Sequence, residues 1–81
     1  MEIDPEGPVP VYRQLADLLR ARIEAGDYPP GRALPSHRTL SQEYGLAMST
    51  VTKALAILRA EGLTEGVKGK GTYVRTARSR R

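Results

Sequence analysis

Apolar residues recur along the first third of the chain at the spacing of one helix face. They fall at i, i+4, i+7, i+8 and i+12, as on a helix with one buried side: Val11, Leu15, Leu18, Leu19 and Ile23. Gly26 ends this pattern, and Pro29-Pro30-Gly31 prevents the helix from continuing. The spacing predicts a first helix over about residues 10–25, preceded by a polar leader at residues 1–9 that stays outside the core.

A second, shorter helix follows a segment that contains proline. Leu34 precedes a proline and is expected to be extended, because a following proline disfavours the α conformation. Ser36 is a favourable N-cap, since its hydroxyl can accept a hydrogen bond from an amide of the first turn. The pattern predicts a helix from His37 to about Tyr44, which Gly45 ends.

A third helix begins only a few residues later. Its apolar positions fall at i, i+3, i+4 and i+7, on one face: Val51, Ala54, Leu55 and Leu58. They predict a helix over about residues 48–61, and Gly62 before an apolar residue is typical of a left-handed helix cap. The polar residues of its first turns are left for other directions: Ser49, Thr50, Thr52 and Lys53.

The period changes after Gly62 from that of a helix to that of a strand. An alternating stretch and a second extended stretch flank the turn sequence Lys68-Gly69-Lys70-Gly71. The pattern predicts a β-hairpin over residues 63–75. Residues 76–81 show no periodicity and are expected to be a disordered basic tail or an interdomain linker, which leaves residues 10–75 as the single domain.

Composition removes several classes of protein. A chain of 81 residues has room for one small domain. With no cysteine and one histidine, it lacks the residues for a disulfide scaffold, a thiolate zinc site or a histidine-cluster site, and we expect neither a metal nor a cofactor. The acidic, proline-rich start differs from a signal peptide, and no apolar run reaches the roughly 20 residues of a membrane span. We therefore expect a cytoplasmic domain with no membrane partner.

Charge is unevenly distributed along the chain, whose net charge is +4. Residues 1–31 hold six acidic and three basic side chains, whereas residues 32–81 hold three acidic and ten basic ones. Such a basic half attracts a polyanion, and nucleic acid is the most common candidate. A solvated basic tail is the simpler alternative, since four arginines lie within residues 75–81.

The order of the predicted elements indicates how such a polyanion would bind. Two helices joined by a short turn form a helix-turn-helix, and a hairpin directly after it has the position of a wing. The predicted fold is mainly α with a small β-hairpin: a winged helix-turn-helix of three helices and a two- or three-stranded wing. Helix 48–61 would then lie in the major groove of double-stranded DNA, and wing 63–75 on the backbone or in the minor groove.

A series of short motifs runs through the chain in a fixed order. They are Pro10-Val-Tyr12-Arg-Gln14, Gly26, Pro30-Gly31, Leu34-Pro35-Ser36-His37-Arg38-Thr39-Leu40, Gly45, Thr50-Val51, Ala54-Leu55, Leu58, Glu61-Gly62-Leu63 and Lys70-Gly71-Thr72-Tyr73-Val74. Over about residues 10–75 the chain thereby resembles the DNA-binding domain of GntR-family bacterial transcription regulators. The Pro-x-Tyr-x-Gln opening is similar to the subgroups around HutC, YtrA and MocR. The resemblance implies a winged helix that binds operator DNA as a symmetric pair, usually to repress transcription.

The resemblance and the polar positions together give a set of candidate DNA contacts. The resemblance implies that Arg38 contacts the backbone or a base edge, and it assigns the glycines and lysines of the turn to the wing. Hydroxyls near a helix N-terminus can meet phosphates or base edges, although capping is their simpler role. The complete set is Ser36, His37, Arg38, Ser49, Thr50, Thr52, Lys53, Lys68, Gly69, Lys70 and Gly71.

The recognition helix departs from the family pattern Ser-Arg-x-Thr-Val-Arg. An alanine stands where the N-cap hydroxyl is usual, and Met48 and Thr52 stand where two arginines are usual. Arginine suits guanine edges and phosphates best, so part of the family's contact set is absent. Met48 could instead contact a thymine methyl. Lys53 compensates only in part, because it lies about 100° further round the helix.

Family members usually continue into a larger domain that binds a small molecule and often supplies the dimer contact. The chain is thus expected to be either the excised DNA-binding part of a longer regulator or a stand-alone winged helix, with an effector only in the first case. We expect a homodimer on an inverted-repeat operator in the bacterial cytoplasm, associated with the nucleoid. No catalytic trio is recognisable, so we expect no enzyme. Two alternatives stay open: a protein-interaction module, and a non-specific nucleic-acid binder.

Overall fold

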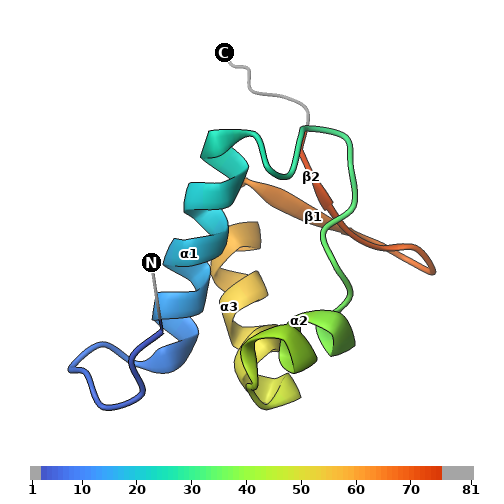
Figure 1. Ribbon diagram of the computed structural model, residues 1–81. Helices are drawn as coiled ribbons and strands as arrows, with labels where there is room; N and C mark the ends of the chain where they lie inside the picture. Colours follow the sequence, from blue (N-terminus) through green and yellow to red (C-terminus); the bar gives the residue numbers. More distant parts are fainter. Residues whose placement is uncertain (1–2, 76–81) are drawn as a thin grey trace.

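Three helices and one antiparallel hairpin make up the structure, a computed structural model that describes residues 3–75 (Figure 1). In chain order they are α1 (Val11–Ala25), α2 (His37–Tyr44), α3 (Met48–Ala60), β1 (Thr64–Val67) and β2 (Gly71–Val74). The predicted helices and hairpin are confirmed, each end lying within one residue of the expected position. The tail predicted at residues 76–81 lies outside the described residues.

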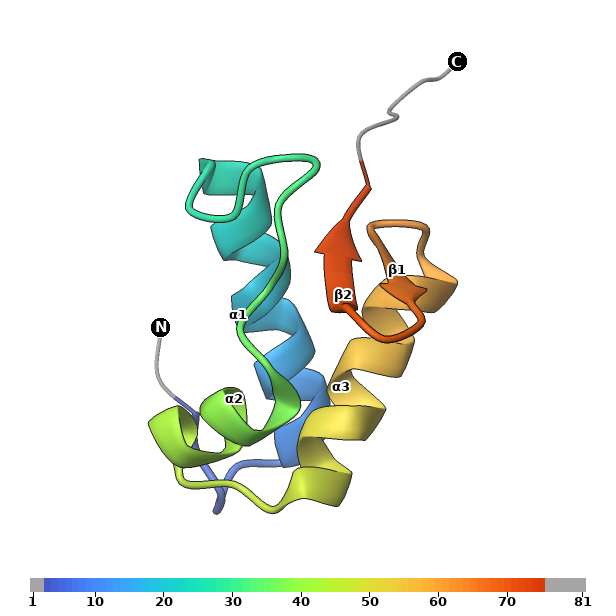
Figure 2. The same cartoon turned by 90° about the vertical axis from the view of Figure 1, so that its right-hand side faces the viewer.

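The core lies where the three helices meet. α1 runs alongside α3, and α2 packs against α3 near the turn that joins them (Figures 1 and 2). Every helix contributes side chains with no exposed surface: Leu15, Leu19, Leu40, Val51, Ala54 and Leu58. Because α3 buries only this apolar face, its polar residues are left on the outside.

Each helix ends at a glycine in the left-handed conformation, as predicted. Gly62 has a φ of 81°, and the Leu63 N–H donates to the Leu58 carbonyl at 3.0 Å, the long bond of a Schellman motif. Equivalent bonds close α1 at Gly26 and α2 at Gly45. A side chain would strain the backbone at Gly62, where the chain turns from α3 directly into the hairpin.

The segment that leads into α2 attaches to the outer side of the hairpin. β1 and β2 pair antiparallel over four residue pairs, and Ala33 adds a single bridge to Tyr73. The Leu34 N–H donates to the Thr72 carbonyl at 2.8 Å. The wing is therefore a two-stranded sheet to which Ala33 adds one bridge in the place of a third strand. Main-chain hydrogen bonds join it to the segment that leads into α2.

Residues 3–9 fold back onto the start of α1. The Gln14 side-chain amide donates to the carbonyls of Asp4 and Val9, both at 2.7 Å, and its oxygen accepts from the Asp4 N–H at 2.6 Å. Ile3 is half-buried against the core. The leader lies outside the buried core, but its Ile3 packs against that core, and the Gln14 hydrogen bonds hold the segment in place.

An arginine of α1 binds the end of α3. The Arg20 guanidinium donates to both carboxylate oxygens of Glu61, at 2.8 and 2.7 Å, and to Asp17 at 2.6 Å. The hydrogen bonds from Arg20 hold the pKa of Glu61 below its usual range, and those to Glu61 and Asp17 raise the pKa of Arg20. This pair joins residues that are 41 positions apart in the chain.

The ion pair predicts an acid dependence of stability. Since the pKa of Glu61 is lowered on folding, its contribution is present above the ordinary carboxyl pKa and is lost as the pH falls through the folded value. We expect Glu61→Gln and Arg20→Gln each to flatten the fall in Tm below about pH 5. Thermal unfolding over a pH series measures this. If the Tm of both variants falls with pH as steeply as that of the wild-type chain, the exposed pair contributes nothing to stability.

Candidate nucleic-acid interface

α2, α3 and the hairpin share one face of the molecule. In Figure 2, α2 and the first turns of α3 border the lower part of this face, and the hairpin borders its upper part. Figure 1 shows the turn of the hairpin projecting away from the helices. The predicted DNA contacts all lie on these elements or directly before and between them.

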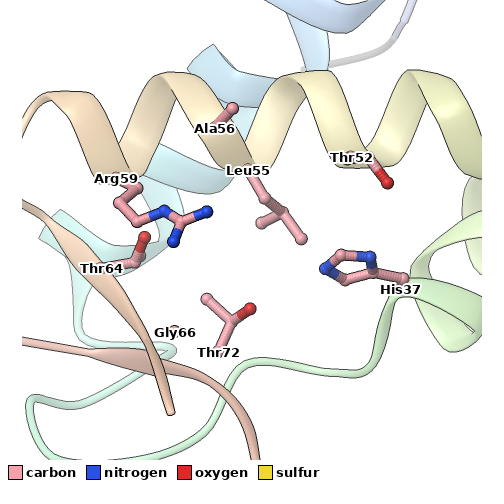
Figure 3. A pocket seen from close by; sticks show the side chains of 8 residues that line it. All are labelled: His37, Thr52, Leu55, Ala56, Arg59, Thr64, Gly66 and Thr72. Carbon is pink, nitrogen blue, oxygen red and sulfur yellow. The ribbon is translucent and has the colours of Figure 1, made fainter. Parts of the chain in front are cut away.

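The start of α2 is closed by a side-chain cap. The Ser36 hydroxyl accepts from the Thr39 N–H at 3.1 Å and donates to the Thr39 hydroxyl at 2.9 Å, so its role in the folded chain is capping, as predicted. Arg38 is exposed in the first turn, where the helix dipole favours an anion. His37 is half-buried and points into the space between α2 and α3 (Figure 3).

The hydroxyl candidates on α3 do not point in one direction. Successive residues of a helix lie about 100° apart, and the core takes one side of α3. Ser49 and Thr52 are exposed, whereas Thr50 is half-buried. Met48 is also exposed, with 48% of its surface accessible, at the start of the same helix. The exposed side chains in the first turns of α3 are therefore Met48, Ser49, Thr52 and Lys53.

Lys53 lies on the flank of α3 that faces α1. Its Nζ is 5.6 Å from the centroid of the Tyr12 ring, within the range of a cation–π interaction. Thr52, its neighbour in sequence, lines the space on the α2 side of α3 (Figure 3). The two residues thus occupy different flanks, and the lysine is held by the first turn of α1.

The turn of the hairpin presents its charges to solvent. Lys68, Gly69, Lys70 and Gly71 are all exposed. The turn is closed by a hydrogen bond from the Lys70 N–H to the Val67 carbonyl at 2.9 Å, and both glycines have positive φ. The ion pairs within residues 3–75 all involve Arg20, so no carboxylate described there neutralises either lysine.

A cavity of about 240 Å³ lies between α3, the start of α2 and the hairpin (Figure 3). Its polar lining consists of His37, Thr52, Arg59, Thr64 and Thr72. The structure thereby brings together two of the predicted residues, one from α2 and one from α3. The other members of the predicted set do not line it.

Arg59, Thr64 and Thr72 are not among the residues predicted from the sequence. Arg59 follows Thr52 by seven residues, which is nearly two full helical turns, so the helical period placed both on one side of α3. This spacing was the available signal. Thr64 is only 1% exposed, and its hydroxyl has no hydrogen-bond partner among residues 3–75. No sequence pattern distinguishes this threonine from an ordinary strand residue.

The described part of the chain holds no cluster of three or more histidine, cysteine or acidic residues arranged to bind a metal ion. None of the helices found there is long and apolar enough to cross a membrane. The cavity lining contains no carboxylate. What this face offers is hydrogen-bond donors and cations around an exposed helix.

Three helices, a tight turn between the last two and a basic hairpin define a winged helix-turn-helix domain. Residues 11–74 match the family described as "Bacterial regulatory proteins, gntR family". The chain belongs to this family, which confirms the resemblance seen in its motifs.

Similar proteins share most of this chain but are often much longer. The chain is 38% identical over 74 residues to the HTH-type transcriptional repressor NagR of Bacillus subtilis. The matched region covers 91% of this chain but only 30% of NagR. YtrA from Sulfolobus acidocaldarius, a GntR-family transcription factor, has a similar structure, with a TM-score of 0.86, 36% identity and coverage of 95% of this chain and 81% of that one. The AraR DNA-binding domain in complex with operator ORX1 matches with a TM-score of 0.82, 30% identity and coverage of 91% and 95%.

The cap of α2 gives a test of how Ser36 contributes to folding. Ser36→Ala is expected to lower the free energy of unfolding by about 1 kcal/mol, because the Thr39 N–H loses its partner. Ser36→Asp keeps an acceptor at the same place and should retain most of the stability. Urea unfolding of both variants measures the difference. Equal loss in the two would show that the hydroxyl does not act as a cap.

Proposed function

We propose that this chain binds duplex DNA sequence-selectively as the DNA-reading domain of a transcriptional repressor. In this proposal α3 enters the major groove and the hairpin lies on the backbone or in the adjacent minor groove. The major groove is about 12 Å wide and admits one α-helix, which requires a helix with a free side. α3 has such a side, since its buried residues all lie on the face toward the other helices.

The similarity to the AraR DNA-binding domain carries this proposal. That domain was solved in complex with its operator, and it shares 30% of its residues with this chain over nearly its whole length. NagR, which is 38% identical, is a transcriptional repressor. The same family and the same arrangement of helix and wing support the same use of the fold here.

The residue roles in this proposal follow from exposure. Arg38, Lys68 and Lys70 are exposed cations on one face and are assigned to phosphates. Ser49 and Thr52 are assigned to base edges or nearby phosphates, and the exposed Met48 to a thymine methyl. Ser36 is assigned to the N-cap of α2. Thr50 is half-buried, and α3 has no side-chain cap, so Thr50 is assigned to a base edge. Lys53 reaches DNA only if it leaves the Tyr12 ring.

We further infer that two copies bind an inverted repeat and that residues 10–75 act as the domain that reads each half. A symmetric site is what a pair of identical helix-turn-helix domains requires. The chain spans 30% of the length of NagR, so an effector-binding part belongs to this proposal only for a protein that continues beyond this domain. The basic residues at 76–81 would add phosphate contacts.

Selection from a random duplex library tests the proposal. The purified chain is incubated with the library at about 150 mM salt, which suppresses purely ionic binding. An enriched inverted repeat is expected, and its spacing gives the geometry of the pair. An enriched single half-site would support reading of DNA but overturn pairing by this chain alone. No enrichment would overturn sequence-selective binding and favour a protein-binding module or a non-specific binder.

The hairpin lysines should affect all sequences alike. We expect Lys68→Ala combined with Lys70→Ala to weaken binding to any duplex and to reduce the slope of log affinity against log salt by about 1.8, since each phosphate contact contributes about 0.9. Fluorescence anisotropy over a salt series measures this slope. The matched control, Arg13→Gln with Arg22→Gln, removes two exposed charges from α1 and should leave the slope unchanged. An unchanged slope in the lysine variant would remove the hairpin from the interface.

A further inference from the structure

The cavity between α3, the start of α2 and the hairpin has the chemistry of an anion site. Arg59 extends from α3 toward the hairpin, and the His37 ring faces it from the opposite end (Figure 3). The hydroxyls of Thr64 and Thr72 belong to the hairpin side, and the Thr52 hydroxyl lies on α3 beside His37. Because no carboxylate lines the cavity, these donors have no built-in acceptor of opposite charge.

The Thr64 hydroxyl points independently to a ligand. Thr64 is 99% buried, and its Oγ1 has no hydrogen-bond partner within residues 3–75. Buried hydroxyls are nearly always paired, so an unpaired one in the lining of the cavity needs an explanation, and a ligand of the cavity would supply it. Figure 3 shows this oxygen on the side of the cavity where the Arg59 guanidinium lies.

Arg59 is free to bind such an oxygen. The ion pairs within the described part of the chain all involve Arg20, so Arg59 has no carboxylate partner there. Its guanidinium lies over Gly66 of β1, where a side chain would come within 3.5 Å of Nη1. This is an ordinary van der Waals distance, so the guanidinium packs against the backbone of the hairpin at Gly66. Glu65, the carboxylate next to it in β1, points to the other face of the hairpin because side chains alternate along a strand.

We propose that this cavity binds a phosphate oxyanion, with Arg59 as its charged ligand and Thr64, Thr72 and His37 as hydrogen-bond donors. A guanidinium matches the geometry of a phosphate in a two-pronged contact, and a tetrahedral anion accepts hydrogen bonds from several directions at once. The cavity opens between the proposed recognition helix and the wing. A DNA backbone phosphate is thus the natural source, which rests on the proposed function, and free phosphate is the other.

DNA binding as a function of salt concentration tests whether a DNA backbone phosphate is the ligand of the cavity. Arg59→Gln is expected to reduce affinity for the selected duplex about tenfold and the log–log salt slope by about 0.9. Arg13→Gln, which removes an exposed charge from α1, is the matched control and should change neither. If Arg59→Gln behaves like Arg13→Gln while the wild-type chain binds its duplex, a DNA backbone phosphate is not the ligand of the cavity, and the proposed function stands.

A second variant separates the phosphate contact from folding. Thr64→Val keeps the shape of the side chain and removes only the unpaired hydroxyl. We expect an equal or higher Tm, because a buried polar group without a partner is lost, together with at least threefold weaker DNA binding. A lower Tm with unchanged DNA binding would mean that the hydroxyl serves the fold alone and would overturn its role as a ligand.

Titration with inorganic phosphate at constant ionic strength tests whether free phosphate binds in the cavity. In ¹⁵N NMR spectra of the 81-residue chain, we expect saturable shifts of the Arg59 side-chain N–H and of the Thr64 and Thr72 amides, and none of these in Arg59→Gln. Shifts with free phosphate support the cavity even if the chain selects no duplex and the proposed function fails. Shifts at these residues with DNA alone identify a backbone phosphate as the ligand. No shift with either overturns the proposal.

Discussion

The burial of one face of α3 determines the position of every exposed group on the side that faces α2 and the hairpin. Removing a leucine or valine side chain from water contributes about 1.5–3 kcal/mol, whereas an exposed ion pair contributes at most about 1 kcal/mol. Rotating α3 by one residue would expose several buried side chains and bury polar ones without partners. Burial of the apolar face therefore determines the orientation of α3, and the ion pair between Arg20 and Glu61 adds only a small further stabilisation. Met48, Ser49, Thr52 and Arg59 are presented together because the opposite face of the helix is apolar.

The helices and the hairpin could be predicted from the sequence because their determinants are local. Apolar spacing, a serine N-cap and glycines at the helix ends act within a few residues of each other, and all of them are found in the structure. The contacts that join the elements could not be predicted in this way. Gln14 binds the backbone of the leader, and Arg20 reaches Glu61 across 41 positions of sequence. Neither contact has a periodic pattern, since each depends on how the elements pack.

The candidate site was predictable only in its outline. The sequence indicated the right elements, and His37 and Thr52 do line the cavity between them. Which side of α3 a residue occupies depends on its angle relative to the core, and this separates Lys53, over the Tyr12 ring, from Thr52 beside it. Arg59 was not predicted because it lies nearly two turns beyond Thr52 on the same side of α3, outside the first turns in which contacts were expected. The unpaired hydroxyl of Thr64 is a property of burial, which only the structure reveals.

The attachment of the α2 lead-in to the hairpin also affects how the protein behaves at high concentration. The Gly31 N–H donates to the Val74 carbonyl at 2.9 Å, and with the bond from Leu34 to Thr72 it occupies the outer edge of β2. Within residues 3–75 this leaves β1 as the strand with an open edge. Exposed edges are templates for the strands of other molecules, but this one is four residues long and carries a charged side chain at Glu65. Short, charged edges resist strand-to-strand association, so the hydrogen bonds that position the wing also protect the domain against aggregation through its sheet.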